Sequence, residues 1–151
     1  MLTASFGTGA KHPGAIAICR GVPTWYKGLR YIELAPTKVM LQKENLVNFD
    51  QTYARILADL NPQKVYDELC KLAGKAEPVL LCWEAFGLRC HRRWVAEFFE
   101  AAIPGLQIPE IGHARADSIR YVDMPRKGTA AAKRIMDASK KAGKSKSATL
   151  W

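Results

Sequence analysis

The chain has 151 residues, of which 48% are hydrophobic, and its net charge is +9. This length suits a single domain with a real core, and the hydrophobic content excludes a chain that is disordered throughout. No apolar run approaches the roughly 20 residues of a membrane-spanning helix, and the first residues lack the pattern of a signal peptide. We therefore expect a cytoplasmic protein that does not contact a membrane.

The hydrophobic pattern predicts strands that alternate with helices. In chain order, we expect strands at 2–6, 15–19 and 30–34, helices at 38–46, from Asp50 onward and from Asn61 to Gly74, a strand at 78–82, a helix at 90–102 and a strand at 106–111. This alternation favours a single three-layer α/β domain, with a small, mostly parallel or mixed sheet flanked by helices. Because sites gather at the carboxyl ends of such strands, the loops after Cys19 and Cys82 are expected to meet.

The positive charge is concentrated at the C-terminal end. Residues 120–151 contain nine Lys or Arg and two Asp, so they carry +7 of the net charge of +9. We expect an α/β domain over 1–124 and a basic, partly flexible arm over 125–151, in which 130–141 can become helical on binding. Such an arm suits nucleic acid, DNA rather than RNA, although a solubilising tail is the alternative. The residues expected to bind it are Arg126, Lys127, Lys133, Arg134, Lys140, Lys141, Lys144 and Lys146.

The densest chemistry lies in the twelve residues from Cys82 to Arg93, which hold two thiols, a carboxylate, an imidazole and three guanidinium groups. A helix that begins near Cys90 would offer free backbone N–H groups to an anion. We expect His91 and Arg92 to face the site and Arg93 to face solvent. The alternative is that these arginines cap the helix or form local salt bridges.

Three residues of this segment are candidate catalytic groups: Glu84, Cys90 and His91. Glu84 is the only acid there, and it can act as a general base or hold the loop through an ion pair with Arg20 or Arg92. A thiol at a helix start beside Arg and His would have a lowered pKa, so Cys90 is either a nucleophile or a structural thiol. We expect Cys82 to be a small hydrophobe that ends a buried strand.

The candidate substrate-binding residues lie in two loops and combine cations with aromatic rings. A cation can clamp a phosphate while a base stacks on a ring, although aromatic residues in a loop can also simply close the core. These candidates are Arg20, Trp25, Tyr26, Lys27, Trp83, Arg89 and Arg92.

No metal site or cofactor is predicted. Cys82, Cys90 and His91 offer three donors, but the eight-residue step between the cysteines and the adjacent Cys-His pair differ from common zinc spacings. The four cysteines form no C-x-x-C pair, so we expect reduced thiols.

Short motifs occur in a characteristic order over residues 1–103. They are Thr3-Ala4-Ser5-Phe6, Ile18-Cys19-Arg20-Gly21-Val22-Pro23, Tyr26-Lys27-Gly28, Leu34-Ala35-Pro36, Leu80-Leu81-Cys82-Trp83-Glu84 and Cys90-His91-Arg92. This set resembles the family catalogued as domain of unknown function 488. The resemblance implies a compact α/β fold and a Cys-His-Arg site, but no reaction. The family's loop between the two cysteines is charged and often acidic, whereas here it is Ala-Phe-Gly-Leu-Arg, so a different substrate or partner preference is expected.

These features together favour an enzyme that acts on nucleic acid or a nucleotide. The most specific expectation is hydrolysis of a base glycosidic bond, as in a DNA glycosylase with a repair or defence role, with Glu84 activating water and Arg20, His91 and Arg92 fixing a phosphate or sugar. The alternatives are a nucleic-acid-binding accessory protein without catalysis, and a thiol enzyme that acts on a small anionic substrate.

Overall fold

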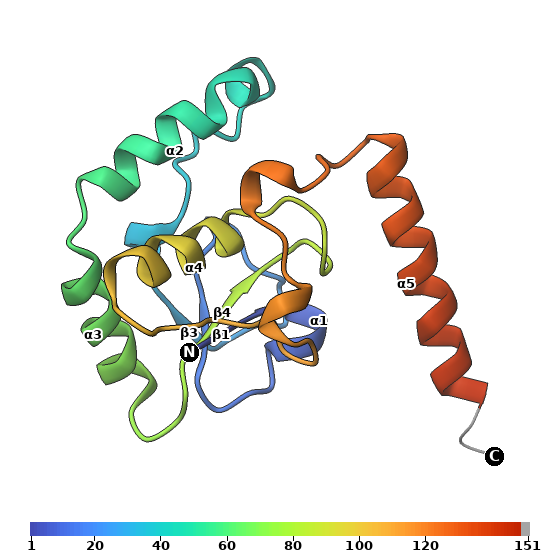
Figure 1. Ribbon diagram of the computed structural model, residues 1–151, viewed down its shortest axis with the longest axis horizontal. Coiled ribbons are helices and arrows are strands. Elements are labelled where there is room, and N and C mark those ends of the chain that lie inside the picture. Colours follow the sequence, from blue (N-terminus) through green and yellow to red (C-terminus); the bar gives the residue numbers. More distant parts are fainter. Residues whose placement is uncertain (149–151) are drawn as a thin grey trace.

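A computed structural model describes residues 1–148 of the chain, with side chains for residues 1–141. Its centre is one sheet of four parallel strands in the order β1-β4-β2-β3 (Figure 1). The strands are β1 (Leu2–Ser5), β2 (Ala15–Ala17), β3 (Leu29–Arg30) and β4 (Val79–Cys82). Val79 pairs with Leu2 on one side and with Ala15 on the other, so β4 is an inner strand. Its continuous apolar sequence fits burial on both faces.

Within residues 1–148, five helices accompany the sheet, together with short 3₁₀ turns. The helices are α1 (Phe6–Gly9), α2 (Phe49–Ala58), α3 (Pro62–Ala73), α4 (His91–Ala102) and α5 (Ala130–Ala148). The 3₁₀ turns are η1 (Ile32–Leu34), η2 (Lys43–Asn48), η3 (Arg115–Asp117) and η4 (Tyr121–Asp123). Among the residues that the structure covers, no helix combines the length and apolar character needed to cross a membrane.

The two faces of the sheet are covered unequally. Ile16 and Leu80 pack on one face with Tyr53 of α2, Leu69 of α3 and Phe99 of α4. The opposite face, which carries Ala4, Ala17 and Leu81, packs with Phe6 of α1 and Tyr26 of a loop. The α/β class with a small parallel sheet flanked by helices is therefore confirmed. The layer on the second face consists of the one-turn helix α1 and loops.

The ends of helix α3 follow capping residues in the sequence, whereas the start of helix α2 differs from the expected position. The side chain of Asn61 accepts the backbone N–H of Lys64 at 2.9 Å, and α3 ends before Gly74, as expected. Helix α2 has Asn48 as its N-cap and begins at Phe49, one residue before the expected start at Asp50.

Three expected elements differ because their backbones find other hydrogen-bond partners. The strand expected at 30–34 ends at Arg30 and gives way to η1, and the helix expected at 38–46 is replaced by turns followed by η2. The strand expected at 106–111 is reduced to one bridge between Thr3 and Glu110.

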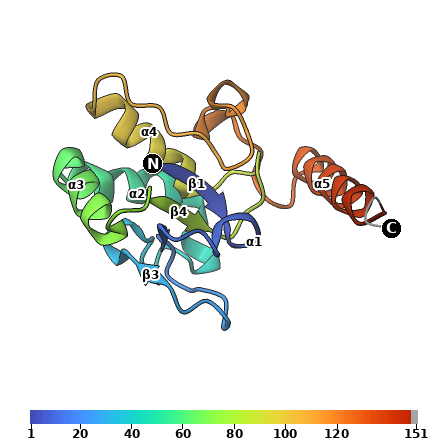
Figure 2. The same cartoon turned by 90° about the horizontal axis from the view of Figure 1, so that it is seen from below.

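Helix α5 stands apart from the sheet and its covering helices (Figures 1 and 2). Its first turns touch the domain, because Ala132 is buried and Ile135 lies beside Gly87 in the loop after β4. A helix over the expected residues 130–141 is therefore present. The flexibility expected of part of the arm stays a prediction.

Candidate functional site

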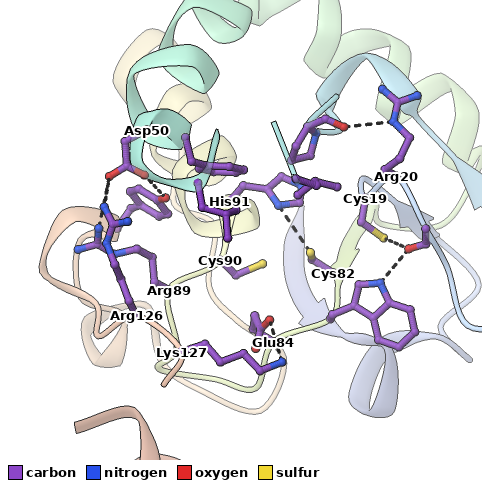
Figure 3. Close-up of a pocket in the computed structure, with 17 residues that line it drawn as sticks. Cys19, Arg20, Asp50, Cys82, Glu84, Arg89, Cys90, His91, Arg126 and Lys127 are labelled. Atoms are coloured by element: carbon purple, nitrogen blue, oxygen red, sulfur yellow. Dashed lines mark hydrogen bonds and ion pairs between the residues drawn. The ribbon is translucent and has the colours of Figure 1, made fainter. Parts of the chain in front are cut away.

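A pocket of about 410 Å³ opens at the carboxyl ends of β2 and β4 (Figure 3). Cys19 and Arg20 line it from the loop after β2, and Cys82 and Glu84 line it from the end of β4 and the loop that follows. The indole N–H of Trp83 donates to the carbonyl of Gly21 at 2.8 Å and ties these two loops together. The expected meeting of the two loops is confirmed.

Thiols and an imidazole from separate elements meet at the floor of this pocket. The Sγ of Cys82 lies 3.6 Å from Nδ1 of His91, and Nε2 of His91 lies 2.6 Å from the carbonyl oxygen of Ile18. Because a carbonyl can only accept, Nε2 carries the hydrogen in the neutral ring and Nδ1 presents its lone pair to Cys82. His91 is therefore held between two protein groups, which leaves no ring nitrogen free for a phosphate.

The buried thiols differ in acidity. The hydrogen bond with Cys19, together with burial, raises the pKa of Cys82 to about 12, and the same hydrogen bond lowers the pKa of Cys19. Burial raises the pKa of Cys90 as well. The lowered pKa expected for Cys90 is therefore wrong, because the sulfur lies inside the protein and not at an open helix start. A catalytic role for Cys90 stays a prediction.

The two arginines after His91 turn away from the pocket. Arg92 donates to both carboxylate oxygens of Glu110, at 2.8 and 3.1 Å, and the Thr3 hydroxyl donates to the same carboxylate at 2.7 Å. Arg93 is only 4% exposed and donates to the carbonyl of Ile108 and to Glu100. The expected orientation of Arg93 towards solvent is wrong, because α4 carries it under the 106–110 segment. Arg92 does not reach the substrate pocket either.

Arg89 lines the pocket, but its guanidinium is engaged by the protein. It donates to the backbone carbonyls of Val122 and Met124 and to the carboxylate of Asp50. Asp50 also accepts from the Tyr121 hydroxyl at 2.7 Å and from Arg126 at 3.0 Å. This network fastens the segment that leads to α5 onto the start of α2 (Figure 3).

Glu84 lies at the rim of the pocket. Its carboxylate is 4.0 Å from Nζ of Lys127, while its side chain is 26% exposed and that of Lys127 is 72% exposed. The ion pair expected with Arg20 or Arg92 is thus formed with Lys127 instead. A partly exposed carboxylate beside an exposed cation is accessible to water and to a ligand.

The family model for "Domain of unknown function DUF488" matches residues 25–99. Over this segment the chain is similar to DUF488. The segment contains Cys82-Trp83-Glu84 and Cys90-His91-Arg92, which carry the resemblance seen in the sequence, whereas the motifs at 3–6 and 18–23 precede it. No curated protein and no solved structure matches the chain.

The DUF488 segment supplies the apolar walls of the pocket as well as its floor. Phe49 from α2 and Trp83 from the loop after β4 line it together with Leu41 and Leu46. Trp83 is 54% exposed, so about half of its side chain is accessible to solvent. Tyr121, from beyond the DUF488 segment, completes the aromatic lining.

The early loop contributes less than expected, because only Arg20 of its candidate residues lines the pocket. The Tyr26 hydroxyl donates to the carbonyls of Ala15 and Leu29, and the ring is buried, so this residue closes the core. Trp25 is 61% exposed and packs its edge against Phe6. Lys27 lies on the surface away from the pocket.

The basic residues after the DUF488 segment fall into two groups. Arg126 and Lys127 line the pocket. Lys133, Arg134, Lys140 and Lys141 are exposed on α5. The side chains of Lys144 and Lys146 lie outside the described residues.

Sequence reasoning missed pocket residues that come from segments without a chemical motif. Asp50, Phe49 and Tyr121 reach the pocket through tertiary packing, and no local signal indicates this. Cys19 could have been found, because it directly precedes Arg20 at the carboxyl end of a predicted strand.

Proposed function

We propose that this protein is an enzyme that acts on nucleic acid or a nucleotide and hydrolyses the bond between a base and its sugar. One observation supports this proposal above the others: the pocket has mainly apolar and aromatic walls, while its rim carries the Glu84 carboxylate beside basic side chains. Such a pocket suits one nucleotide, whose base is flat and apolar on its faces and whose phosphate is anionic.

The walls offer stacking surfaces for a base. Phe49, Trp83 and Tyr121 come from three separate segments and surround the cavity. An enzyme that acts on a base must take it out of the stack, and aromatic side chains then replace the lost stacking partners. The volume of about 410 Å³ lies within the range of small-ligand sites.

The rim offers cations for the phosphate backbone. Arg126 and Lys127 line the pocket, and both side chains are more than half exposed. Lys133, Arg134, Lys140 and Lys141 continue this positive charge along α5. A strand whose flipped nucleotide occupies the pocket would therefore meet a basic surface as it leaves the mouth.

Glu84 is the carboxylate best placed for the reaction. The other carboxylate of the pocket, that of Asp50, already accepts hydrogen bonds from Arg89, Tyr121 and Arg126. Glu84 takes a proton from water, the water oxygen bonds to the sugar carbon, and the carbon–nitrogen bond breaks. The base leaves with the bonding electron pair and is protonated by solvent.

The thiol alternative has less support. The hydrogen bond with Cys19 raises the pKa of Cys82, and burial raises the pKa of Cys90, so both of these thiols are protonated at neutral pH. A protonated thiol is a poor nucleophile.

The experiment compares wild-type protein with Glu84→Gln on DNA and RNA oligonucleotides that carry damaged or modified bases. Released base is measured by chromatography and mass spectrometry. We expect Glu84→Gln to slow release by about 100-fold or more, the usual scale for a general base. Glu44→Gln is the matched control, because Glu44 is an exposed acid in η2 and does not line the pocket.

Two results would contradict the proposal. One is full activity in Glu84→Gln. The other is tight nucleic-acid binding without release of any base by the wild-type protein, which would favour the accessory role.

A further inference from the structure

We propose that Cys82, Cys90 and His91 form a zinc site at the floor of the pocket. One donor atom from each of these three residues lies within 4.8 Å of the other two, and all three residues are buried. This donor set of two thiolates and one imidazole is found in catalytic zinc sites, where the fourth position is open. The inference is independent of the hydrolysis proposed above, because zinc binding can be measured without a substrate.

The distances suit a tetrahedral ion. Zinc bonds of about 2.3 Å to sulfur and about 2.0 Å to nitrogen place neighbouring ligand atoms roughly 3.5 to 3.8 Å apart. Cys82 Sγ and His91 Nδ1 are already 3.6 Å apart. The remaining pairs lie within 4.8 Å, so small side-chain rotations would bring them into range.

The imidazole is oriented as a ligand requires. Its Nε2 hydrogen is donated to the Ile18 carbonyl at 2.6 Å, which leaves the lone pair of Nδ1 pointing at the thiols. Metal-bound histidines almost always donate their other ring N–H to such a partner, which fixes the ring and raises its basicity.

The backbone explains how adjacent residues can share one ion. Cys90 is the N-cap of α4 with an extended conformation, at φ −145° and ψ 140°, whereas His91 is the first helical residue. This change of conformation sends both side chains to the same point, opposite Cys82 at the end of β4. The unusual Cys-His spacing is therefore no obstacle, because Cys82 ends β4, Cys90 directly precedes α4 and His91 begins it.

The charges around the site balance. A zinc ion with two thiolates and a neutral imidazole has no net charge, and the nearby Arg92 is neutralised by Glu110. Zinc would displace the two thiol protons on binding. Its fourth position would face the pocket, which Cys19 and Glu84 also line.

The experiment uses the full-length protein, reduced and stripped with a chelator, then reloaded with Zn²⁺ or Co²⁺. We expect one metal ion per chain by mass spectrometry, and cobalt spectra with sulfur-to-metal charge-transfer bands. Cys82→Ser and Cys90→Ser should weaken binding by more than the roughly 10- to 100-fold that outer-shell partners contribute. Cys70→Ser is the matched control, because Cys70 lies on α3 and is not part of the cluster.

Because the two ligand cysteines are buried, circular dichroism must show that their variants fold. The wild-type protein gives a second measurement: Zn²⁺, but not Mg²⁺, should raise its melting temperature in a concentration-dependent way. The proposal fails if the wild-type protein binds no more zinc than Cys82→Ser, or if Cys70→Ser abolishes the cobalt bands. Glu84→Gln should bind as much zinc as the wild-type protein. The zinc proposal and the hydrolysis proposal can therefore fail separately.

Discussion

Arg92 belongs to the Cys-His-Arg motif, but its contacts stabilise the fold. Its guanidinium and the Glu110 carboxylate form a buried pair that also accepts the Thr3 hydroxyl, and this joins α4 to β1 and the 106–110 segment. Removal of one partner from such a pair leaves a buried charge without compensation, which is costly.

We therefore predict that Glu110→Gln lowers the free energy of unfolding by about 3 to 5 kcal/mol. Asp123→Asn is the matched control, because it breaks the exposed pair with Arg120 and should lower the free energy of unfolding far less. Urea unfolding of the three proteins measures both effects. If both variants lowered the free energy of unfolding equally, the buried Arg92–Glu110 pair would be no more important for stability than the exposed one.

The orientation of residues 91–93 could not be predicted from the sequence. Consecutive helical residues point in directions about 100° apart, so the sequence predicts that they diverge but not which one faces the pocket. Glu84 lies at the pocket because it follows the end of a buried strand, while its catalytic role stays a prediction. His91 lines the pocket, yet its contact with Cys82 depends on the exact docking of α4 on β4.

At the scale of elements, the end of α4 is held by a cluster around Glu100. Burial alone would raise the pKa of Glu100, but hydrogen bonds from Arg115, the Ile108 backbone and Arg93 bring it below its ordinary value of 4.5. A carboxyl with a lowered pKa in the folded state stabilises the protein above its ordinary pKa, and this contribution is lost as the pH falls through the folded value.

We predict that Glu100→Gln destabilises the protein most near neutral pH. The difference from the wild-type protein should shrink as the pH falls from about 7 towards about 3, because the wild-type carboxyl then becomes protonated as well. Urea unfolding across this range measures the difference. A constant difference would show that hydrogen bonding, and not the charge of Glu100, stabilises this corner.

Elements with strong local signals could be predicted, and those that depend on distant partners could not. Helix α3 has its cap, its proline and its terminal glycine within one stretch of sequence. By contrast, the 106–111 segment pairs with β1 only at Thr3, and the local sequence does not indicate where such pairing stops. The Pro109 carbonyl and the Ile111 N–H do bond with Thr3, but the pairing extends no further.

At the scale of the whole molecule, the positive charge lies mainly on a helix outside the sheet domain. Lys133, Arg134, Lys140 and Lys141 are exposed on α5, and the pocket opens near the segment that leads to it. If the arm holds the phosphate backbone, then binding should release counterions in proportion to the contacts made.

We predict that replacement of these four residues by Gln weakens binding to duplex DNA and flattens its dependence on salt. Each lost phosphate contact should lower the slope of log K against log salt by roughly 0.9. Fluorescence anisotropy across a salt series measures this slope. The control is the double variant Lys64→Gln, Lys71→Gln on α3. An equal loss of DNA affinity in this control would indicate non-specific attraction by the total charge of the protein.

The Asp50 carboxylate is shared by three donors, which affects how the stabilities of their variants combine. Arg89, Arg126 and Tyr121 all donate to this one carboxylate, and they come from the loop before α4 and from the segment that leads to α5. Once one donor is removed, the others can rearrange around the same oxygen atoms. The energetic effects of substitutions at these three positions will therefore be non-additive, and a double-mutant cycle is needed to separate them.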